Sequence, residues 1–190
     1  MTIRKFETHT PDIHPSAYVD DTAIVIGEVD IGEDSSVWPM TVIRGDVNFI
    51  KIGKRTNIQD ASVLHVTHAP NEHSEKIGAA QTGYALSIGD DVTIGHKALL
   101  HACEIQDRVL VGMGAIVMDG TVVESDTMIA AGAVVPPRKT LESGYLWVGN
   151  PARKTRALTE KEKQYLPYSA QHYMRLKERT QASESEDYSY

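Results

Sequence analysis

Residues 105–135, IQDRVLVGMGAIVMDGTVVESDTMIAAGAVV, carry an apolar residue at every sixth position. These positions are Ile105, Val111, Val117, Val123, Ile129 and Val135. A second run with the same step consists of Ile13, Val19, Val25, Ile31, Val37, Ile43 and Phe49. Shorter runs are Ile52, Ile58, Leu64 and Ile88, Ile94, Leu100. A step of six fits neither a helix nor a heptad, but it is a multiple of the two-residue period of a β-strand.

The step of six predicts short strands separated by corners, with three strands in each triangular coil of roughly eighteen residues. One coil cannot bury its inward residues alone, so coils must stack and share a core of small aliphatic side chains. Only 6% of the residues are aromatic, which suits a narrow core. A β-sandwich is the alternative, but its turn signals recur every 8–12 residues or so. We therefore predict an all-β fold, a single-stranded parallel β-helix of hexapeptide repeats.

The predicted β-helix spans residues 13–150 and follows an N-terminal segment of residues 1–12. Polar and turn-forming residues interrupt the repeat and predict an excursion loop over about 69–85. Residues 151–181 are predicted to be helical, and the Ser/Glu-rich residues 182–190 to be a disordered tail.

Two features are expected to shape the helical segment. Thr159 and Glu162 have the spacing of a capping box, which predicts a helix start. Pro167 is expected to break or kink that helix, because proline lacks the backbone N–H that a helix needs. A second helix is then predicted from Tyr168 to about Arg179.

Composition limits the classes of function. The chain has 190 residues, a formal net charge of −7 and one cysteine. The mild acidity argues against a nucleic-acid partner, and no apolar run is long enough to span a membrane. Residues 1–7 lack the apolar core of a signal peptide. A lone cysteine excludes an internal disulfide framework and fits a reducing compartment, so we expect a cytoplasmic protein with Cys103 as a packed thiol.

Three histidines occupy informative positions in the repeat. His65 follows Leu64 and His101 follows Leu100, so both come directly after an inward residue. With the excursion removed they are one coil apart, and two imidazoles stacked at about 4.8 Å can share a metal ion. His96 is separated from His101 by a corner and must point from another edge. If all three bind one metal, His96 comes from a neighbouring molecule around a threefold axis. Three imidazoles with an open position form a catalytic zinc site.

The sequence resembles the γ-class carbonic anhydrases and their bacterial carbonic-anhydrase-like relatives, which are trimers of left-handed β-helices. The segments that carry the resemblance are Val42–Asp46, Thr56–Asp60, Val63–His65, Ile94–His96, Leu100–Cys103 and Val148–Arg153. The resemblance implies a homotrimer in which His65 and His101 of one subunit and His96 of the next hold zinc, or iron or cobalt. It implies that a metal-bound hydroxide attacks CO2 to give bicarbonate, reversibly.

The resemblance also implies roles for residues around the metal. Gln59 and Asn57 are expected beside the metal and the substrate. Arg44, Asp46 and Asp60 match residues that connect subunits near the site. From the repeat itself, Arg44 follows Ile43 and shares the position of His65 and His101, where a guanidinium could clamp a carboxylate. Tyr168 resembles a family tyrosine on the C-terminal helix.

The chain departs from the best-known archaeal form of the family in its proton shuttle. Val47 and His68 stand where that form carries glutamates. His68 is the natural substitute, because imidazoles exchange protons near neutral pH. Glu72, His73 and Glu75 are weaker candidates. We therefore expect a carbonic anhydrase of low activity.

Two other functions stay open. The first is a hexapeptide acyltransferase that uses an acyl-CoA donor and a single histidine as base. The second is a trimeric metal-binding scaffold with weak or no turnover.

Overall fold

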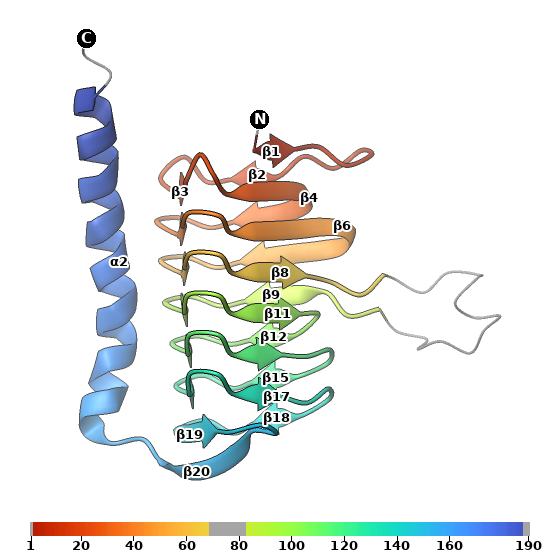
Figure 1. The fold of residues 1–190 in the computed structure, drawn as a ribbon, viewed down its shortest axis with the longest axis vertical. Coiled ribbons are helices and arrows are strands. Elements are labelled where there is room, and N and C mark those ends of the chain that lie inside the picture. Colours follow the sequence, from red (N-terminus) through yellow and green to blue (C-terminus); the bar gives the residue numbers. More distant parts are fainter. Residues whose placement is uncertain (1, 69–82, 188–190) are drawn as a thin grey trace, which may run out of the picture.

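The computed structural model of the chain describes the backbone of residues 2–68 and 83–187. Short strands follow one another around a coil, and successive coils stack in parallel (Figure 1). Val111 pairs with Ile129 and Val117 with Val135, so strands eighteen residues apart lie side by side. The predicted parallel β-helix with a C-terminal helix is confirmed.

The coil has three faces, which we name by what lies on their outer side. The apolar face consists of β8 (Val63–His65), β11 (Leu99–His101), β14 (Ile116–Val117), β17 (Val134–Val135) and the first parts of β4 (Ile24–Ile31) and β6 (Val42–Ile52). Within the N-terminal segment, β1 (Ile3–Arg4) pairs with the start of β4 and extends this face.

The polar face follows around the next corner. It consists of β2 (Asp12–Ile13), β9 (Leu86–Ile88), β12 (Glu104–Ile105), β15 (Val122–Val123), β18 (Thr140–Leu141) and the last parts of β4 and β6. Both long strands turn the corner, because β6 pairs with β8 at its start and with β9 at its end.

The helix-covered face is the third side. It consists of β3 (Tyr18–Val19), β5 (Ser36–Val37), β7 (Asn57–Ile58), β10 (Thr93–Ile94), β13 (Leu110–Val111), β16 (Met128–Ile129), β19 (Tyr145–Val148) and β20 (Arg153–Ala157). The helix α2 (Glu160–Asp187) runs along this face and contacts β5, β7 and β10 (Figure 1). The last strand, β20, lies antiparallel to β19, unlike the parallel strands before it.

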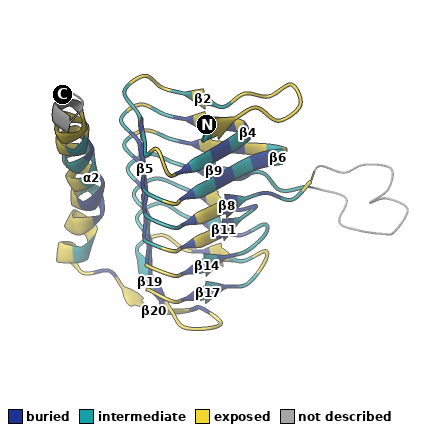
Figure 2. Ribbon diagram, turned by 45° about the horizontal axis from the view of Figure 1, so that its top comes forward, coloured by how far each residue is buried: buried dark blue, intermediate teal, exposed yellow. Residues whose placement is uncertain are grey.

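The inward positions predicted from the step of six form the core. Those from Val25 to Val135 are buried, with one exception, and Ile13 and Val19 pack against the core as partly buried residues (Figure 2). The exception is Phe49, whose side chain is 44% exposed, while Ile50 is buried. In the pairing of β4 with β6, Gly27 to Val29 spans the same stretch as Gly45 to Ile50. The extra residues in β6 turn Phe49 outward, so its predicted inward position is wrong.

The prediction of two helices separated at Pro167 is also wrong. One helix runs from Glu160 through Pro167 to Asp187, and the capping box at its start is formed, since Thr159 and Glu162 exchange hydrogen bonds. A proline inside a helix costs about 3 kcal/mol. Here Leu166 and Ala170 are buried against the coil on either side of it, and this packing holds the helix together.

The helix also continues beyond residue 182, where a disordered tail was predicted. The hydroxyl of Tyr18 donates a hydrogen bond of 2.9 Å to the Glu184 carboxylate and fixes this part of α2 to the first coils. Among the described residues, no helix is long and apolar enough to cross a membrane.

Candidate functional site

His65 and His101 are neighbours on adjacent strands, as the repeat predicted. His101 of β11 pairs directly with His65 of β8, and His65 pairs with Arg44 of β6, so the three side chains form one column at the edge of the apolar face. Nδ1 of His65 lies 3.1 Å from Nε2 of His101. Their ring centroids are 5.1 Å apart.

A carboxylate contacts the other ring nitrogen of each histidine. Nε2 of His65 lies 3.0 Å from Oδ1 of Asp46, and Nδ1 of His101 lies 2.8 Å from Oδ1 of Asp119. Because a carboxylate only accepts hydrogen bonds, these two ring nitrogens carry the hydrogen. In the neutral imidazoles the remaining nitrogens are therefore bare lone pairs, and they face each other.

Burial and hydrogen bonds set the protonation of His65 and of the two carboxylates. Burial is the main cause that lowers the pKa of His65 and keeps its ring neutral. Burial alone would raise the pKa of Asp46, but hydrogen bonds from Arg44 and His65 outweigh it and lower that pKa. At Asp119 burial is likewise outweighed by hydrogen bonds from Thr67 and His101. Both carboxylates are thus ionised, and the ring of His65 stays neutral.

This pair of nitrogens fits a metal ion. Two lone pairs facing each other repel, and a cation between them removes the repulsion. On a tetrahedral zinc ion with Zn–N bonds of 2.0–2.1 Å, two ligand nitrogens are separated by about 3.3 Å. The observed 3.1 Å is close to this value. A carboxylate on the far ring nitrogen is also the usual support of a metal-binding histidine.

His96 lies at a different corner, between the helix-covered face and the apolar face. Nδ1 of His96 is 2.8 Å from Oδ2 of Asp60, so this histidine too has a carboxylate on one nitrogen. The preceding Gly95 is required there, because a Cβ would lie 2.7 Å from the backbone nitrogen of Met113 in the next coil. Among the described residues, no three His, Cys, Asp or Glu side chains gather as a metal-ligand set.

Gln59 and Asn57 belong to the His96 corner. Oε1 of Gln59 accepts a hydrogen bond of 3.2 Å from the backbone N–H of His96, and Nε2 of Gln59 donates to Oδ1 of Asn57 at 3.1 Å. Asn57 in turn donates to the hydroxyl of Thr93, which contacts the hydroxyl of Ser169 on α2 at 2.9 Å. Gln59 and Asn57 are buried, and this network holds both carboxamides in fixed orientations.

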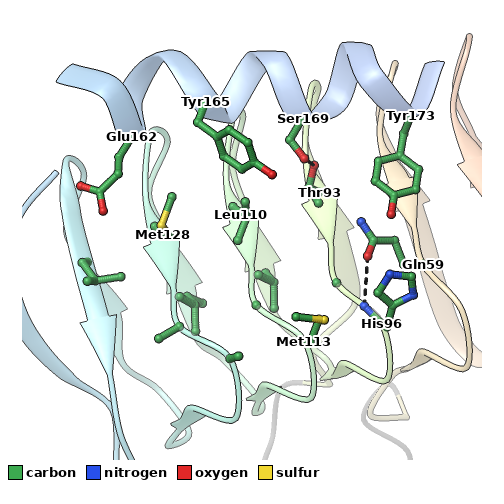
Figure 3. Close-up of a pocket in the computed structure, with 17 residues that line it drawn as sticks. Gln59, Thr93, His96, Leu110, Met113, Met128, Glu162, Tyr165, Ser169 and Tyr173 are labelled. Carbon is green, nitrogen blue, oxygen red and sulfur yellow. Dashed lines mark hydrogen bonds between the residues drawn. The ribbon is translucent and has the colours of Figure 1, made fainter. Parts of the chain in front are cut away.

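A cavity of about 480 Å³ adjoins this corner, between α2 and the helix-covered face. Gln59, His96 and Tyr173 line one end and Glu162 lies at the other, with Met113 and Met128 on its floor (Figure 3). Gly95, His96, Gly112 and Met113 are among its lining residues, so the cavity reaches the corner next to the apolar face.

The structure places Tyr173, rather than Tyr168, beside Gln59 and His96. Tyr173 lines the cavity, and its pKa is raised by burial and by Asp60. Tyr168 is about half exposed and is not among the residues that line the cavity.

The outer surfaces of the two uncovered faces differ in chemistry. Outward residues of the apolar face pair in one column that consists of Ile24, Val42, Val63, Leu99, Ile116 and Val134. The matching column of the polar face consists of Asp12, Asp30, Lys51, Ser87, Glu104, Val122 and Thr140. The apolar column is bordered by the His96 corner on one side and by the column of Arg44, His65 and His101 on the other.

The remaining predicted residues lie near the His65 edge or outside the described part. Arg44 forms an ion pair with Asp46 of its own chain. Val47 and His68 are exposed. Glu72, His73 and Glu75 fall outside the described residues. Cys103 is buried in the core, and burial raises the pKa of its thiol, as expected of a packed cysteine.

Two residues of the site were not predicted from the sequence. Asp119 lies two residues after Val117, which pairs with Leu100, so it is one residue beyond the position stacked on His101, and the repeat alone did not point to it. Tyr173 lies on the helix face of Glu162, Tyr165 and Ser169, at spacings of three and four residues, which become visible once α2 is one continuous helix.

Known proteins are similar to this chain over most of its length. Protein YrdA of Escherichia coli is 48% identical over 93% of this chain and 92% of its own length. Carbonic anhydrase of Geobacillus kaustophilus is 36% identical over 83% of this chain and 79% of its own length. The mitochondrial gamma carbonic anhydrase 1 of Arabidopsis thaliana is 45% identical over 87% of this chain, which spans 58% of that protein.

A solved structure agrees with these relatives. The hexapeptide transferase family protein of Anaplasma phagocytophilum matches with a TM-score of 0.81 and 38% identity, over 93% of this chain and 96% of that one. Comparison with profiles of known protein families gives no match. The β-helix, the paired histidines and the relatives together lead to one conclusion: the chain belongs to the γ-class carbonic anhydrase and γ-carbonic-anhydrase-like family of hexapeptide-repeat proteins.

Proposed function

We propose that the protein is a carbonic anhydrase that reversibly converts CO2 and water into bicarbonate, with a metal ion between subunits of a homotrimer. The observation that supports it best is the pair of facing imidazole nitrogens of His65 and His101, 3.1 Å apart, each ring held by its own carboxylate. A single-histidine acyltransferase would need neither the second imidazole nor this orientation.

His96 of the neighbouring subunit would complete the metal site. The apolar column supports this assembly, because a monomer seldom leaves a whole face of outward aliphatic side chains in water. A contact that joins the His96 corner of one subunit to the His65 edge of the next covers this column and closes into a ring of three. Each site would then combine His65 and His101 of one subunit with His96 and Gln59 of the next.

We propose zinc as the metal, with iron or cobalt as the alternatives. Held by three neutral histidines, such an ion supplies Lewis acidity and a water whose pKa is near 7. The residues of the chain supply the rest. Gln59 has both ends of its carboxamide fixed, by His96 and Asn57, which leaves one N–H and one lone pair to orient CO2 or bicarbonate.

Proton export sets the expected rate. His68 is exposed close after His65 and is the proposed group that passes protons to solvent. Val47 cannot transfer protons, so we expect slower turnover than in relatives with glutamates at these positions. Tyr168 is proposed from the resemblance alone, and Tyr173 is better placed. The single buried cysteine supports a reducing, cytoplasmic location.

The test combines metal content with turnover. Protein purified without chelators is expected to carry about one metal ion per subunit and to hydrate CO2 in a stopped-flow assay when loaded with zinc or iron. His65→Ala is expected to lose metal and activity together. Fewer than about one ion per three subunits would contradict the proposal. Full metal loading without CO2 hydration would favour the scaffold, and turnover of acyl-CoA without bound metal would favour the acyltransferase.

A further inference from the structure

Asp119 links His101 to the segment that directly follows β8. One oxygen of its carboxylate, Oδ1, accepts from Nδ1 of His101 at 2.8 Å. The other, Oδ2, accepts a short hydrogen bond from the hydroxyl of Thr67. Both oxygens are therefore used, and the plane of the carboxylate is fixed relative to the imidazole of His101.

Thr67 is itself held at two points. Its backbone N–H donates to the carbonyl of Tyr84 at 3.2 Å, and its carbonyl accepts from the carboxamide of Asn48 at 3.2 Å. The hydroxyl that holds Asp119 thus belongs to a fixed piece of backbone. Hydrogen bonds therefore connect Thr67 to Asp119 and Asp119 to His101, the proposed metal ligand.

We infer that Asp119 is a positioning residue, which keeps the hydrogen of His101 on Nδ1 and so directs the lone pair of Nε2 at the metal. The inference rests on the proposed function, since it assumes that His101 binds a metal. Asp46 contacts the ring of His65 in the same way as Asp119 contacts the ring of His101. The family resemblance pointed to Asp46 but not to Asp119. Without the carboxylate, His101 can rotate or take the other tautomer, in which Nε2 carries a hydrogen and cannot bind.

The expected effect is on metal affinity. Removal of such a supporting group typically weakens metal binding about 10- to 100-fold, and we expect this for Asp119→Asn. Thr67→Val leaves the carboxylate in place but frees one of its oxygens, so we expect a smaller loss, of a few-fold. Asp30→Asn is the matched control, because Asp30 is exposed on the polar face, far along the coil from His101.

The experiment measures Zn²⁺ affinity of the full chain by competition with a chromophoric chelator, and the visible spectrum of Co²⁺-loaded protein. Asp119→Asn should bind Zn²⁺ more weakly than the wild type and Asp30→Asn, and should shift the Co²⁺ bands. Thermal unfolding of the metal-free variants checks that the coil is intact. If Asp119→Asn does not fold, the Zn²⁺ affinity and the Co²⁺ spectrum of Thr67→Val test the inference instead.

The outcomes separate the inference from the proposed function. Wild-type affinity and an unchanged Co²⁺ spectrum in Asp119→Asn would overturn the role of Asp119 and leave the proposed function standing. If Asp119→Asn does not fold, wild-type affinity and an unchanged Co²⁺ spectrum in Thr67→Val would have the same meaning. A wild type that binds neither Zn²⁺ nor Co²⁺ would overturn both.

Discussion

The apolar face and the polar face have the same inner surface and opposite outer ones. Inside, both contribute at least one buried Ile, Val or Leu per coil to the shared core. Outside, aliphatic residues follow one another along one face, whereas six of the seven residues in the column of the other are polar, and only Val122 is not. The inward rows determine that the chain coils, and the outward rows determine what the coil can contact.

The difference also bears on the position of the site. The third face is covered by α2 of the same chain, which contacts β5, β7 and β10, so the apolar face is the uncovered face with an aliphatic column. It separates His96 from His65 and His101 within one subunit. A partner that covers it brings these residues together, so assembly and metal binding would be one event.

The largest effect should come from a charge on the apolar face. Val63→Glu puts a carboxylate into the proposed interface, where an unpaired charge costs several kcal/mol, so we expect monomers and loss of metal. Val122→Glu makes the same change on the polar face and should leave a metal-loaded trimer. Sedimentation velocity with metal analysis measures both. A trimeric Val63→Glu would show that the apolar face is not the interface.

A mixing experiment tests whether the site is shared between subunits. His96→Ala and His65→Ala should each lose CO2 hydration by at least 100-fold or so. Refolded together in equal amounts, they form trimers in which about a quarter of the sites combine an intact His65 with a neighbour's intact His96. We expect about a quarter of the wild-type activity to return. No recovery, with mixed trimers present, would contradict a shared site.

A smaller effect is expected at the helix-covered face. Lys177 of α2 is buried, and its ammonium donates to the Asp34 carboxylate at 2.9 Å and to the carbonyl of Ser16 at 2.8 Å. Lys177→Met should lower the free energy of unfolding by about 1–3 kcal/mol at pH 7, because both hydrogen bonds are lost. Denaturant titrations measure this value.

The same pair predicts a pH dependence. The hydrogen bond from Lys177 lowers the pKa of Asp34 below its usual value. A carboxyl with a lowered folded pKa contributes stability above its unfolded pKa of about 3.9 and loses it as the pH falls through the folded value. The difference between wild type and Lys177→Met should therefore shrink below about pH 4. An equal difference at pH 7 and pH 3 would exclude the ion pair as its source.

The sequence was most informative where register follows from counting. The inward rows and the column of Arg44, His65 and His101 follow from a step of six, because each coil repeats the last. Counting failed at Phe49, because the extra residues of β6 between Gly45 and Ile50 turn a corner and shift the step of six.

Contacts between segments far apart in the sequence could not be predicted from the step of six. Pro167 is a strong local breaker, but the burial of Leu166 and Ala170 against the coil depends on where α2 docks. Tyr173 reaches the cavity only through that docking. The contact of Asp119 with His101 depends on the residue lost between Leu100 and Ile105, which shifts the count by one.

The antiparallel strand β20 caps the end of the helix-covered face. A stack of parallel strands ends in a row of unpaired N–H and C=O groups, on which another chain could continue the stack. Here the final strand of the sheet reverses direction, is exposed throughout, and carries Arg153, Lys154 and Arg156. A reversed strand with charged side chains, two of them in ion pairs with Glu142 and Glu162, is a poor template for a further strand. At the end of the helix-covered face, β20 thereby protects the coil from continuing into a longer stack.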